Sequence, residues 1–348
     1  MTCVTIAQRI CSGYINDYRL LTMNLHNALN PIMFVTLILG GLPLKFRGKC
    51  KRRLCQILRS NLYNIYSLTI LISVLALNLH AQIYFIDRGS ERSISYSAIA
   101  STVMCILSYV TAVITSYLNF GTISSSFDQF LLHRERFQIF RENYKNLRYN
   151  TIIRLVLGEI IMLAYHISAG AQFKLKLNDI RIYYSFSIIH VVVYVVCVQF
   201  IVFVLVLNGS FSSINSKLLN LLFNMQKFSE MNSDYVFCVN KVGYSTLESF
   251  ENAIKYTVNS LAGCHDDLCN IARKVNIAYS VHIITHLIMT FLNLSFNFYH
   301  TLVLCAFHRE ETRITDFLFP VIGTFFNIFK LLQQVLYCAA CSNEVSPF

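Results

Sequence analysis

The stretch YYSFSIIHVVVYVVCVQFIVFVLVL, Tyr183–Leu207, contains no charged side chain. A helix of about 20 apolar residues spans the hydrocarbon core of a bilayer. The apolar residues follow one another without the alternation of a half-buried strand, so the run favours a helix over a strand of a membrane barrel. The stretch therefore predicts a membrane-spanning helix.

The composition of the whole chain points the same way. The 348 residues are 55% hydrophobic and only 14% charged, with a mean hydropathy of +0.51. A soluble domain of this size carries roughly 25% charged residues. Further apolar runs of similar length occur on both sides of Tyr183–Leu207, so we expect a polytopic membrane protein.

We predict an all-α membrane protein with six transmembrane helices. A shorter apolar stretch, residues 28–44, ends in the Gly- and Pro-containing segment Gly40–Leu44, and we expect it to lie as a helix at the membrane interface. The six predicted spans are residues 62–86, 96–120, 152–173, 183–207, 277–306 and 315–341.

Lys and Arg are distributed unevenly between the two sides of these spans. Lys45–Arg59, before the first span, contains seven basic residues and no acidic one, and Phe127–Asn150, after the second, contains five. The alternate loops, around Asp87–Ser93, Lys174–Arg181 and Arg309–Arg313, contain two, three and two. Because basic residues favour the cytoplasmic side, we predict that both termini are cytoplasmic. This topology accounts for most of the net charge of +11, so we expect membrane lipid, and no nucleic acid, as a partner.

The connection between the fourth and fifth spans is long and has a helical pattern. Leu218–Phe228 and Leu247–Ser280 carry apolar residues near helical spacing, and the second segment runs directly into the fifth span. A cytoplasmic helix with an apolar stripe needs partners, which are either helices of the same chain or other subunits. The predicted organisation is a cytoplasmic and interfacial segment (1–61), four spans (62–207), a cytoplasmic helical region (208–276), two spans (277–341) and a short cytoplasmic tail (342–348).

Leu29–Phe46, LNPIMFVTLILGGLPLKF, comes just before the first predicted span. It resembles the segment with a GLPF-type motif that precedes the first span of insect gustatory receptors. Leu261–Phe291 resembles the long helix that leads into their fifth span, with its His, Leu-Cys and Asn-x-x-(Phe/Tyr)-Ser positions. Leu331–Val345, LLQQVLYCAACSNEV, is similar to the end of their sixth span, where a Cys-rich turn of small residues precedes a Glu. The three segments occur in the family's order.

The resemblance implies a ligand-gated, non-selective cation channel of the plasma membrane that detects small-molecule tastants as a homo- or hetero-tetramer. Family members have seven helices, of which the seventh lines the pore, and the cytoplasmic ends of helices four to seven form an anchor between subunits. Their strongest signature, Thr-Tyr followed by five apolar residues and Gln-Phe on the seventh helix, is absent from this sequence. The alternative hypothesis is a truncated, non-conducting partner or fragment that associates with full-length receptors.

The resemblance places the ligand pocket in the outer half of the bundle, where polar and aromatic residues are the candidates. Polar groups in lipid are costly unless they have partners or line a wet cavity. Asn293 and Asn297 share a helix face, and His300 follows three residues on, so this stripe is the best candidate for a pocket wall. For each residue the alternative is a hydrogen bond between helices. The candidates are Tyr165, His166, Gln172, Tyr184, His190, Tyr194, Asn293, Asn297, His300, Phe319, Thr324 and Asn327.

Glu159 and Lys330 are the charged residues deepest within the predicted spans. Both fall in the inner half when they are counted from the cytoplasmic side at about 1.5 Å per residue. Intramembrane charges usually pair, so we predict an ion pair between the third and sixth spans with a structural or gating role. Alternatively, Lys330 extends to the interface or faces a seventh helix.

Other classes of protein have weaker support. The 12 cysteines lack the spacing of a disulfide framework or zinc site, and Cys264, His265 and Cys269 have no second ligand pair. His282 and His286 form a single pair, whereas a membrane oxidase or desaturase needs several His-rich motifs. We therefore expect no enzyme, no cofactor and no metal.

The sequence gives little information about the ligand. There is no Trp, a frequent aromatic platform in sugar sites, and there are 27 Phe and 20 Tyr. Aromatic residues suit an apolar or amphipathic ligand, which favours bitter plant compounds over sugars.

Overall fold

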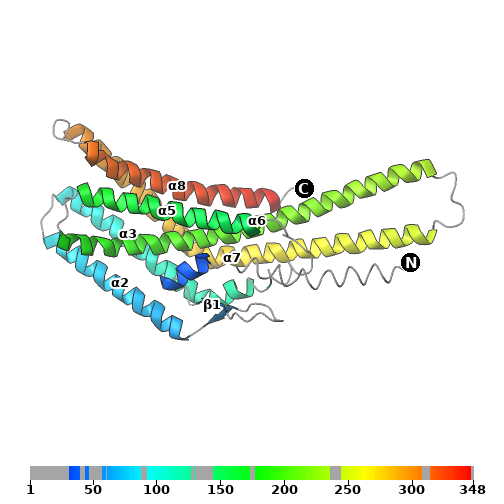
Figure 1. The fold of residues 1–348 in the computed structure, drawn as a ribbon, viewed down its shortest axis with the longest axis horizontal. Coiled ribbons are helices and arrows are strands. Elements are labelled where there is room, and N and C mark those ends of the chain that lie inside the picture. Colours follow the sequence, from blue (N-terminus) through cyan, green and yellow to red (C-terminus); the bar gives the residue numbers. More distant parts are fainter. Residues whose placement is uncertain are drawn as a thin grey trace.

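The computed structural model describes residues 31–39, 44–46, 57–59, 61–87, 92–126, 129, 144–172, 177–235, 244–307 and 314–345. These residues form six long helices, two short helical segments (31–38 and 120–126) and one two-stranded ribbon (Figure 1). Each of the six predicted spans lies almost entirely within one long helix, so their helical character is confirmed. The long helices are α2 (Asn61–Asp87), α3 (Arg92–Leu118), α5 (Tyr144–Gln172), α6 (Leu177–Tyr235), α7 (Tyr244–Phe307) and α8 (Ile314–Val345).

The all-α fold class is confirmed, and one short ribbon lies outside the helices. Strand β1 (Leu44–Phe46) pairs antiparallel with β2 (Ile57–Arg59), and Leu44 lies opposite Arg59. Both strands belong to the basic segment that precedes α2. Strand pairing supplies hydrogen-bond partners for the backbone N–H and C=O groups where this segment reverses direction.

Residues 31–38, within the stretch expected at the membrane interface, form a helix that packs against the bundle. Ile32, Met33 and Thr36 are buried. Gln199 of α6 donates from Nε2 to Met33 Sδ at 3.6 Å, and the Tyr66 hydroxyl of α2 donates to the Ile38 carbonyl at 2.7 Å. The helix is therefore attached to both α6 and α2, and its depth in a bilayer stays a prediction.

Three of the helices are long and apolar enough to cross a membrane, judged on the described residues alone. They are the segments Ile188–Phe223, Ile254–Val303 and Pro320–Val345. A fourth is counted if Val103–Leu118 and Phe120–Ser126, which meet at an angle of 62°, form one bent span. At the bend, Asn119 donates from Nδ2 to the Ala278 carbonyl of α7 at 3.0 Å. The chain is thus a multi-pass helical membrane protein.

Helices α6 and α7 are much longer than a bilayer requires. They contain 59 and 64 residues, which corresponds to roughly 90 and 95 Å at 1.5 Å per residue, against a hydrocarbon core of about 30 Å. Figure 1 shows that the second half of α6 and the first half of α7 leave the bundle together as a two-helix arm. The helical pattern predicted for Leu218–Phe228 and Leu247–Ser280 is confirmed, and α7 continues without a break into the fifth predicted span.

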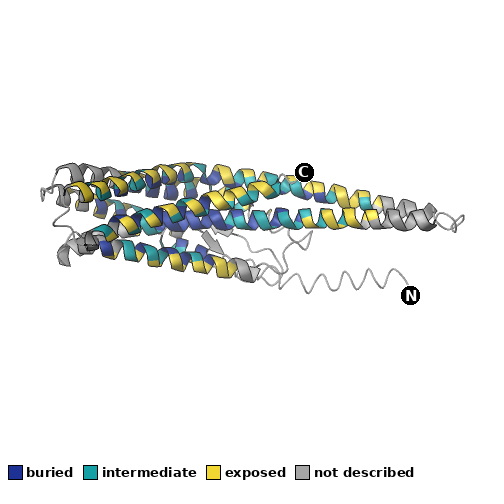
Figure 2. Cartoon of the chain, turned by 90° about the horizontal axis from the view of Figure 1, so that it is seen from above, coloured by how far each residue is buried: buried dark blue, intermediate teal, exposed yellow. Residues whose placement is uncertain are grey.

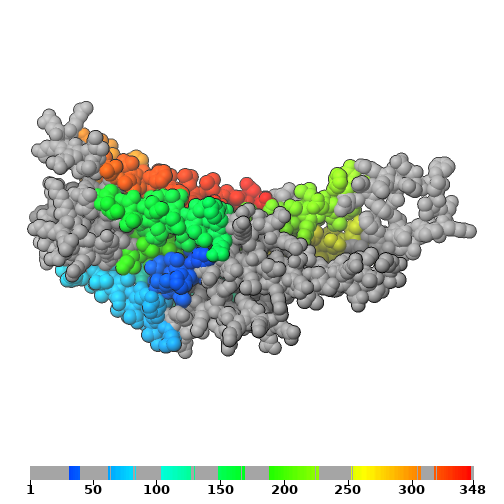
Figure 3. All heavy atoms as spheres, viewed as in Figure 1, coloured from blue at the N-terminus to red at the C-terminus, as the bar shows by residue number. Residues whose placement is uncertain are grey.

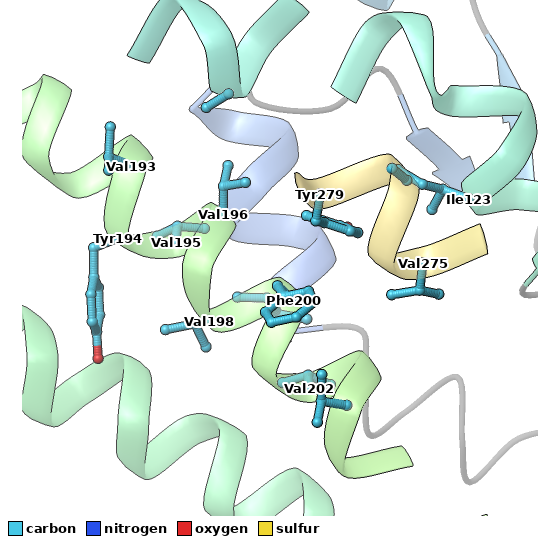
Figure 4. Close-up of a cluster of buried hydrophobic side chains, with 14 of the residues drawn as sticks. Ile123, Val193, Tyr194, Val195, Val196, Val198, Phe200, Val202, Val275 and Tyr279 are labelled. Atoms are coloured by element: carbon cyan, nitrogen blue, oxygen red, sulfur yellow. The ribbon is translucent and has the colours of Figure 1, made fainter. Parts of the chain in front are cut away.

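Helix α6 lies at the centre of the bundle. It contacts α2, α3, α5, α7 and α8, and its residues between Ile189 and Leu207 are almost all buried (Figure 2). Figure 4 shows valines on several sides of this helix, and the Phe200 ring centroid lies 5.5 Å from that of Tyr279 of α7. Because five other helices contact α6, this segment needs no polar face, and its apolar run is uninterrupted.

Helices α5 and α8 lie side by side on one face of the molecule (Figure 3). The Arg154 guanidinium of α5 donates to the Tyr337 hydroxyl of α8, and its Cζ lies 4.1 Å from the centroid of the Tyr337 ring. The Tyr194 hydroxyl of α6 points toward α5 (Figure 4) and donates to the Arg154 carbonyl at 2.8 Å. Gly158 of α5 lies against the Tyr194 ring, and a methyl group at this position would overlap Tyr194 Cζ and Oη.

The C-terminal end of α8 is attached to the base of the arm. Asn215 of α6 donates from Nδ2 to the Glu344 carbonyl at 2.9 Å and to Glu344 Oε2 at 3.0 Å. Nearby on the arm, the Phe211 and His265 rings meet edge to face at 5.4 Å between centroids. The two bonds from Asn215 therefore attach the end of α8 to α6 near the place where α6 and α7 leave the bundle.

Candidate functional site

Buried polar residues follow one face of α7 and one face of α8. We refer to them as the polar seam. Intramembrane polar residues face the interior of a bundle because lipid offers them no hydrogen bonds. The two helices pack against each other, so the two faces meet. The seam consists of His282, His286, Thr290 and Asn297 on α7 and Asn327, Lys330 and Gln334 on α8, all of them buried.

Hydrogen bonds connect the inner part of the seam across three helices. Gln334 donates from Nε2 to His286 Nδ1 at 3.2 Å. The Cys197 thiol of α6 lies 3.5 Å from His282 Nε2, and the rings of His282 and His286 are 6.1 Å apart. These two histidines contact an amide and a thiol, and they do not form part of a cluster of metal-ligating side chains in the described ranges.

Gly323 allows three helices to approach one another at the other part of the seam. A methyl group at this position would lie 2.7 Å from Tyr165 Cε2 of α5 and 2.8 Å from Asn297 Nδ2 of α7. The Gly323 carbonyl accepts a hydrogen bond from Asn327 Nδ2 at 2.9 Å. Three predicted pocket residues, Tyr165, Asn297 and Asn327, are thus brought together around a glycine.

The other predicted site residues are placed differently. His190 Nε2 lies 3.4 Å from the thiol of Cys105 of α3, and Asn293 is a hydrogen-bonding neighbour of the same thiol. Tyr194 faces Gly158 and donates to the Arg154 carbonyl, so it joins α6 to α5, and its ring packs on Phe326 of α8. His300 and Thr324 are half-buried. The side chains of His166, Gln172, Tyr184 and Phe319 lie outside the described part of the structure.

Glu159 and Lys330 are not in the same environment. Lys330 is buried, with Nζ 4.5 Å from the centroid of the Phe326 ring, whereas Glu159 is half-exposed. Both side chains are described, and no ion pair joins them in the structure. Their pairing therefore stays a prediction, and Lys330 belongs to the seam by position.

Sequence reasoning missed six residues of this region, namely Cys105, Cys197, His282, His286, Thr290 and Gln334. Candidates were expected only in the outer half of the predicted spans, where His282 and His286 do not fall. A signal was present in the spacing, because Asn327, Lys330 and Gln334 are three and four residues apart, as residues on one helix face are.

The arrangement leaves several buried polar atoms without a hydrogen-bond partner in the described residues. Buried polar groups in proteins are almost always paired with protein, water or ligand. A seam with this many open positions suits the binding of water or of a small polar molecule. The unpaired atoms in the seam are His286 Nε2, Thr290 Oγ1, Asn297 Nδ2, Asn327 Oδ1 and Gln334 Oε1.

The cysteines on the arm have an ordinary structural setting. Cys264 is buried in the apolar core, and the Cys269 thiol lies 3.7 Å from His265 Nδ1 one turn away. The described part of the chain contains no group of three or more His, Cys, Asp or Glu side chains able to hold a metal ion.

A family comparison matches the chain from the helix at 31–38 to the end of α8. The model of the 7tm chemosensory receptor family covers residues 29–346. The chain belongs to this family. No curated protein matches it.

Membership in the 7tm chemosensory receptors agrees with the resemblance to insect gustatory receptors. It supports a chemoreceptor role in a multi-pass membrane protein, and the family is one of receptors rather than enzymes. The polar seam is therefore the interior of a receptor bundle, and its residues are the ones to test for ligand recognition.

We expect replacement of Gly323 by alanine to change ligand response more than folding. The added methyl displaces the Tyr165 ring and the Asn297 amide, which are ends of side chains that can shift, so the loss of stability should be about 1 kcal/mol. The concentration for half-maximal response should rise at least threefold, as measured by dose–response currents. The Gly121→Ala variant is the control, since a methyl there meets nothing within 4 Å. A response identical in both variants would contradict the placement of the site.

Proposed function

We propose that this chemosensory receptor is a subunit of a ligand-gated, non-selective cation channel in the plasma membrane. Its ligands are small tastants, with bitter or plant compounds favoured by the aromatic composition. The observation that carries the proposal is the polar seam, a row of buried polar side chains with open hydrogen-bonding positions between α7 and α8 of a chemosensory receptor.

Six membrane crossings and a cytoplasmic N-terminus form part of this proposal. Two observations support them: α2, α3, α5, α6, α7 and α8 each contain one predicted span, and the basic residues of the sequence lie on alternate sides of those spans. In this orientation the arm of α6 and α7 projects into the cytoplasm, where an apolar surface is unfavourable unless another protein surface covers it.

Large apolar side chains on the arm support assembly into tetramers. Leu219, Leu222 and Phe223 of α6 are exposed, and so are Tyr256 and Val258 of α7. Lipid does not reach residues this far from the bundle in the proposed orientation. Contacts with the arms of other subunits bury them, which also explains why two helices continue well beyond the membrane.

Charge introduced on the arm is expected to separate the subunits. The Phe223→Glu variant places a carboxylate in the proposed interface, and a central aromatic residue contributes roughly 2 kcal/mol or more to such an interface. Mass photometry of the purified full chain should show the tetramer fraction falling at least tenfold while the subunit remains folded. Asn150→Glu, which introduces the same carboxylate at an exposed polar position on α5 away from the arm, is the matched control and should leave the tetramer intact.

Expression of the full chain in cells under voltage clamp tests the channel function. A panel of bitter plant compounds should evoke inward cation currents that are absent from untransfected cells. Silence when the chain is expressed alone, together with altered currents when it is co-expressed with another receptor of the family, would replace the channel with the alternative of a non-conducting partner.

A further inference from the structure

Lys330 is a buried cation without a counter-charge in the described part of the chain. Its side chain is 4% exposed, and its Nζ lies over the Phe326 ring. Its other electrostatic neighbours include the thiols of Cys197 and Cys105. Thiols are ordinarily uncharged near neutral pH. Burying an ammonium group is costly unless an anion neutralises it. The site therefore favours a negatively charged occupant.

His286 provides a second donor beside Lys330. The amide nitrogen of Gln334 can only donate, so His286 Nδ1 accepts its hydrogen bond, and in a neutral imidazole the proton is then on Nε2. His286 is 1% exposed, and its Nε2 has no partner among the described residues. Lys330 is one turn from Gln334 on the same face of α8, and Gln334 bonds His286, so the ammonium and the imidazole N–H belong to the same buried region.

An apolar wall lies next to these donors. The Phe326 ring, which is in contact with the Lys330 ammonium, is buried and packs against Tyr194 with 5.9 Å between ring centroids. A single cation balances a single negative charge, whereas an ionised phosphate carries about −1.5 to −2. Charge, donors and wall together fit a molecule with one carboxylate and an apolar body.

We propose that the polar seam binds a small organic carboxylate, with Lys330 as its counter-charge. The carboxylate oxygens accept hydrogen bonds from the Lys330 ammonium and from His286 Nε2, and the apolar part of the ligand packs on Phe326. This proposal rests on the proposed receptor function, because it names the ligand class of the same seam.

Binding to the purified full chain in lipid nanodiscs tests the proposal without any need for channel activity. The probes are benzoate and hexanoate, each with its uncharged amide and its primary amine, at constant chloride concentration, and the readout is titration calorimetry. At least one carboxylate should bind, and at least tenfold more tightly than its amide. Equal binding of carboxylate and amide, or no binding of either carboxylate, would overturn the proposal.

Variants assign the effect to one side chain. Lys330→Gln removes the charge and should weaken carboxylate binding about 10- to 100-fold, the range for a hydrogen bond to a charged group, while amide binding changes little. Lys330→Arg should retain much of the carboxylate preference. Lys255→Gln, which removes the same charge from an exposed position on the arm, should bind as the wild type does. If Lys330→Gln does not fold, the wild-type comparison of carboxylate, amide and amine decides alone.

The two proposals fail separately. Carboxylate binding without any ligand-evoked current would contradict the channel function and leave the Lys330 site intact. Currents evoked only by uncharged compounds, with no carboxylate preference in the binding experiment, would overturn the Lys330 site and leave the channel function intact.

Discussion

Replacing Gly158 by alanine is expected to destabilise the receptor by about 3 kcal/mol, at the upper end of the usual cost of overpacking a core. The added methyl group would overlap the Cζ, Oη and Cε1 atoms of Tyr194. The ring cannot move aside easily, because the Tyr194 hydroxyl donates to the Arg154 carbonyl and the ring packs on Phe326. Fluorescence-detected size-exclusion chromatography after heating should show a lower melting temperature and a smaller folded fraction.

Two further variants identify the cause of this loss. Gly263→Ala on α7 makes the same change where a methyl meets nothing within 4 Å, and it should be neutral or stabilising by roughly 0.5–1 kcal/mol, since alanine favours a helix over glycine. In the Gly158→Ala background, Tyr194→Leu should restore part of the stability by removing the ring. If the second change adds to the damage, steric conflict with Tyr194 is not the cause.

Replacing Arg154 by methionine is expected to cost about 2–3 kcal/mol, since it removes a charge-assisted hydrogen bond and a ring contact together. The guanidinium donates to the Tyr337 hydroxyl and lies over the Tyr337 ring, so it joins α5 to α8. Tyr337→Phe keeps the ring and removes the hydroxyl, and it should cost about 1 kcal/mol. Melting temperatures of both single variants and of the double variant give the coupling between the two residues.

Arg148 provides the control for Arg154. It lies on the same helix with an exposed side chain, and a surface substitution of this kind usually changes stability by no more than about 0.5 kcal/mol.

The double variant Arg154→Met/Tyr337→Phe should be more stable than the sum of the two single changes predicts. Strict additivity would mean that the contact does not contribute to stability.

The helices of this receptor were predictable because their cause is local. A run of apolar residues in lipid has no water for its backbone, so its N–H and C=O groups must pair within the segment, and a helix achieves this. Tyr183–Leu207 lies within α6, and the helical pattern of Leu247–Ser280 lies within α7. The ribbon of β1 and β2 was missed because it depends on the pairing of two short segments whose own composition gives no strand signal.

The candidate site was predictable only in part. Asn297, Asn327 and Tyr165 were predicted because the family resemblance places the pocket among polar and aromatic groups in the outer half of the bundle, and the structure brings them together at Gly323. Tyr194 was selected on the same grounds and lies against α5 instead. Spacing along one helix shows which residues share a face, but it does not show which neighbouring helix that face meets.

The sequence alone determined that this protein is a multi-pass helical membrane protein related to chemosensory receptors, because composition, apolar length and motif order are all properties of the chain itself. Only the tertiary structure showed the polar seam and the close contacts at Gly158 and Gly323. In the sequence, nothing distinguishes a glycine that packs against a ring of another helix from any other glycine in an apolar helix. Likewise, whether a lysine has a counter-charge depends on neighbours that the sequence does not identify. Both properties depend on how the helices are rotated and packed, which nonlocal contacts decide.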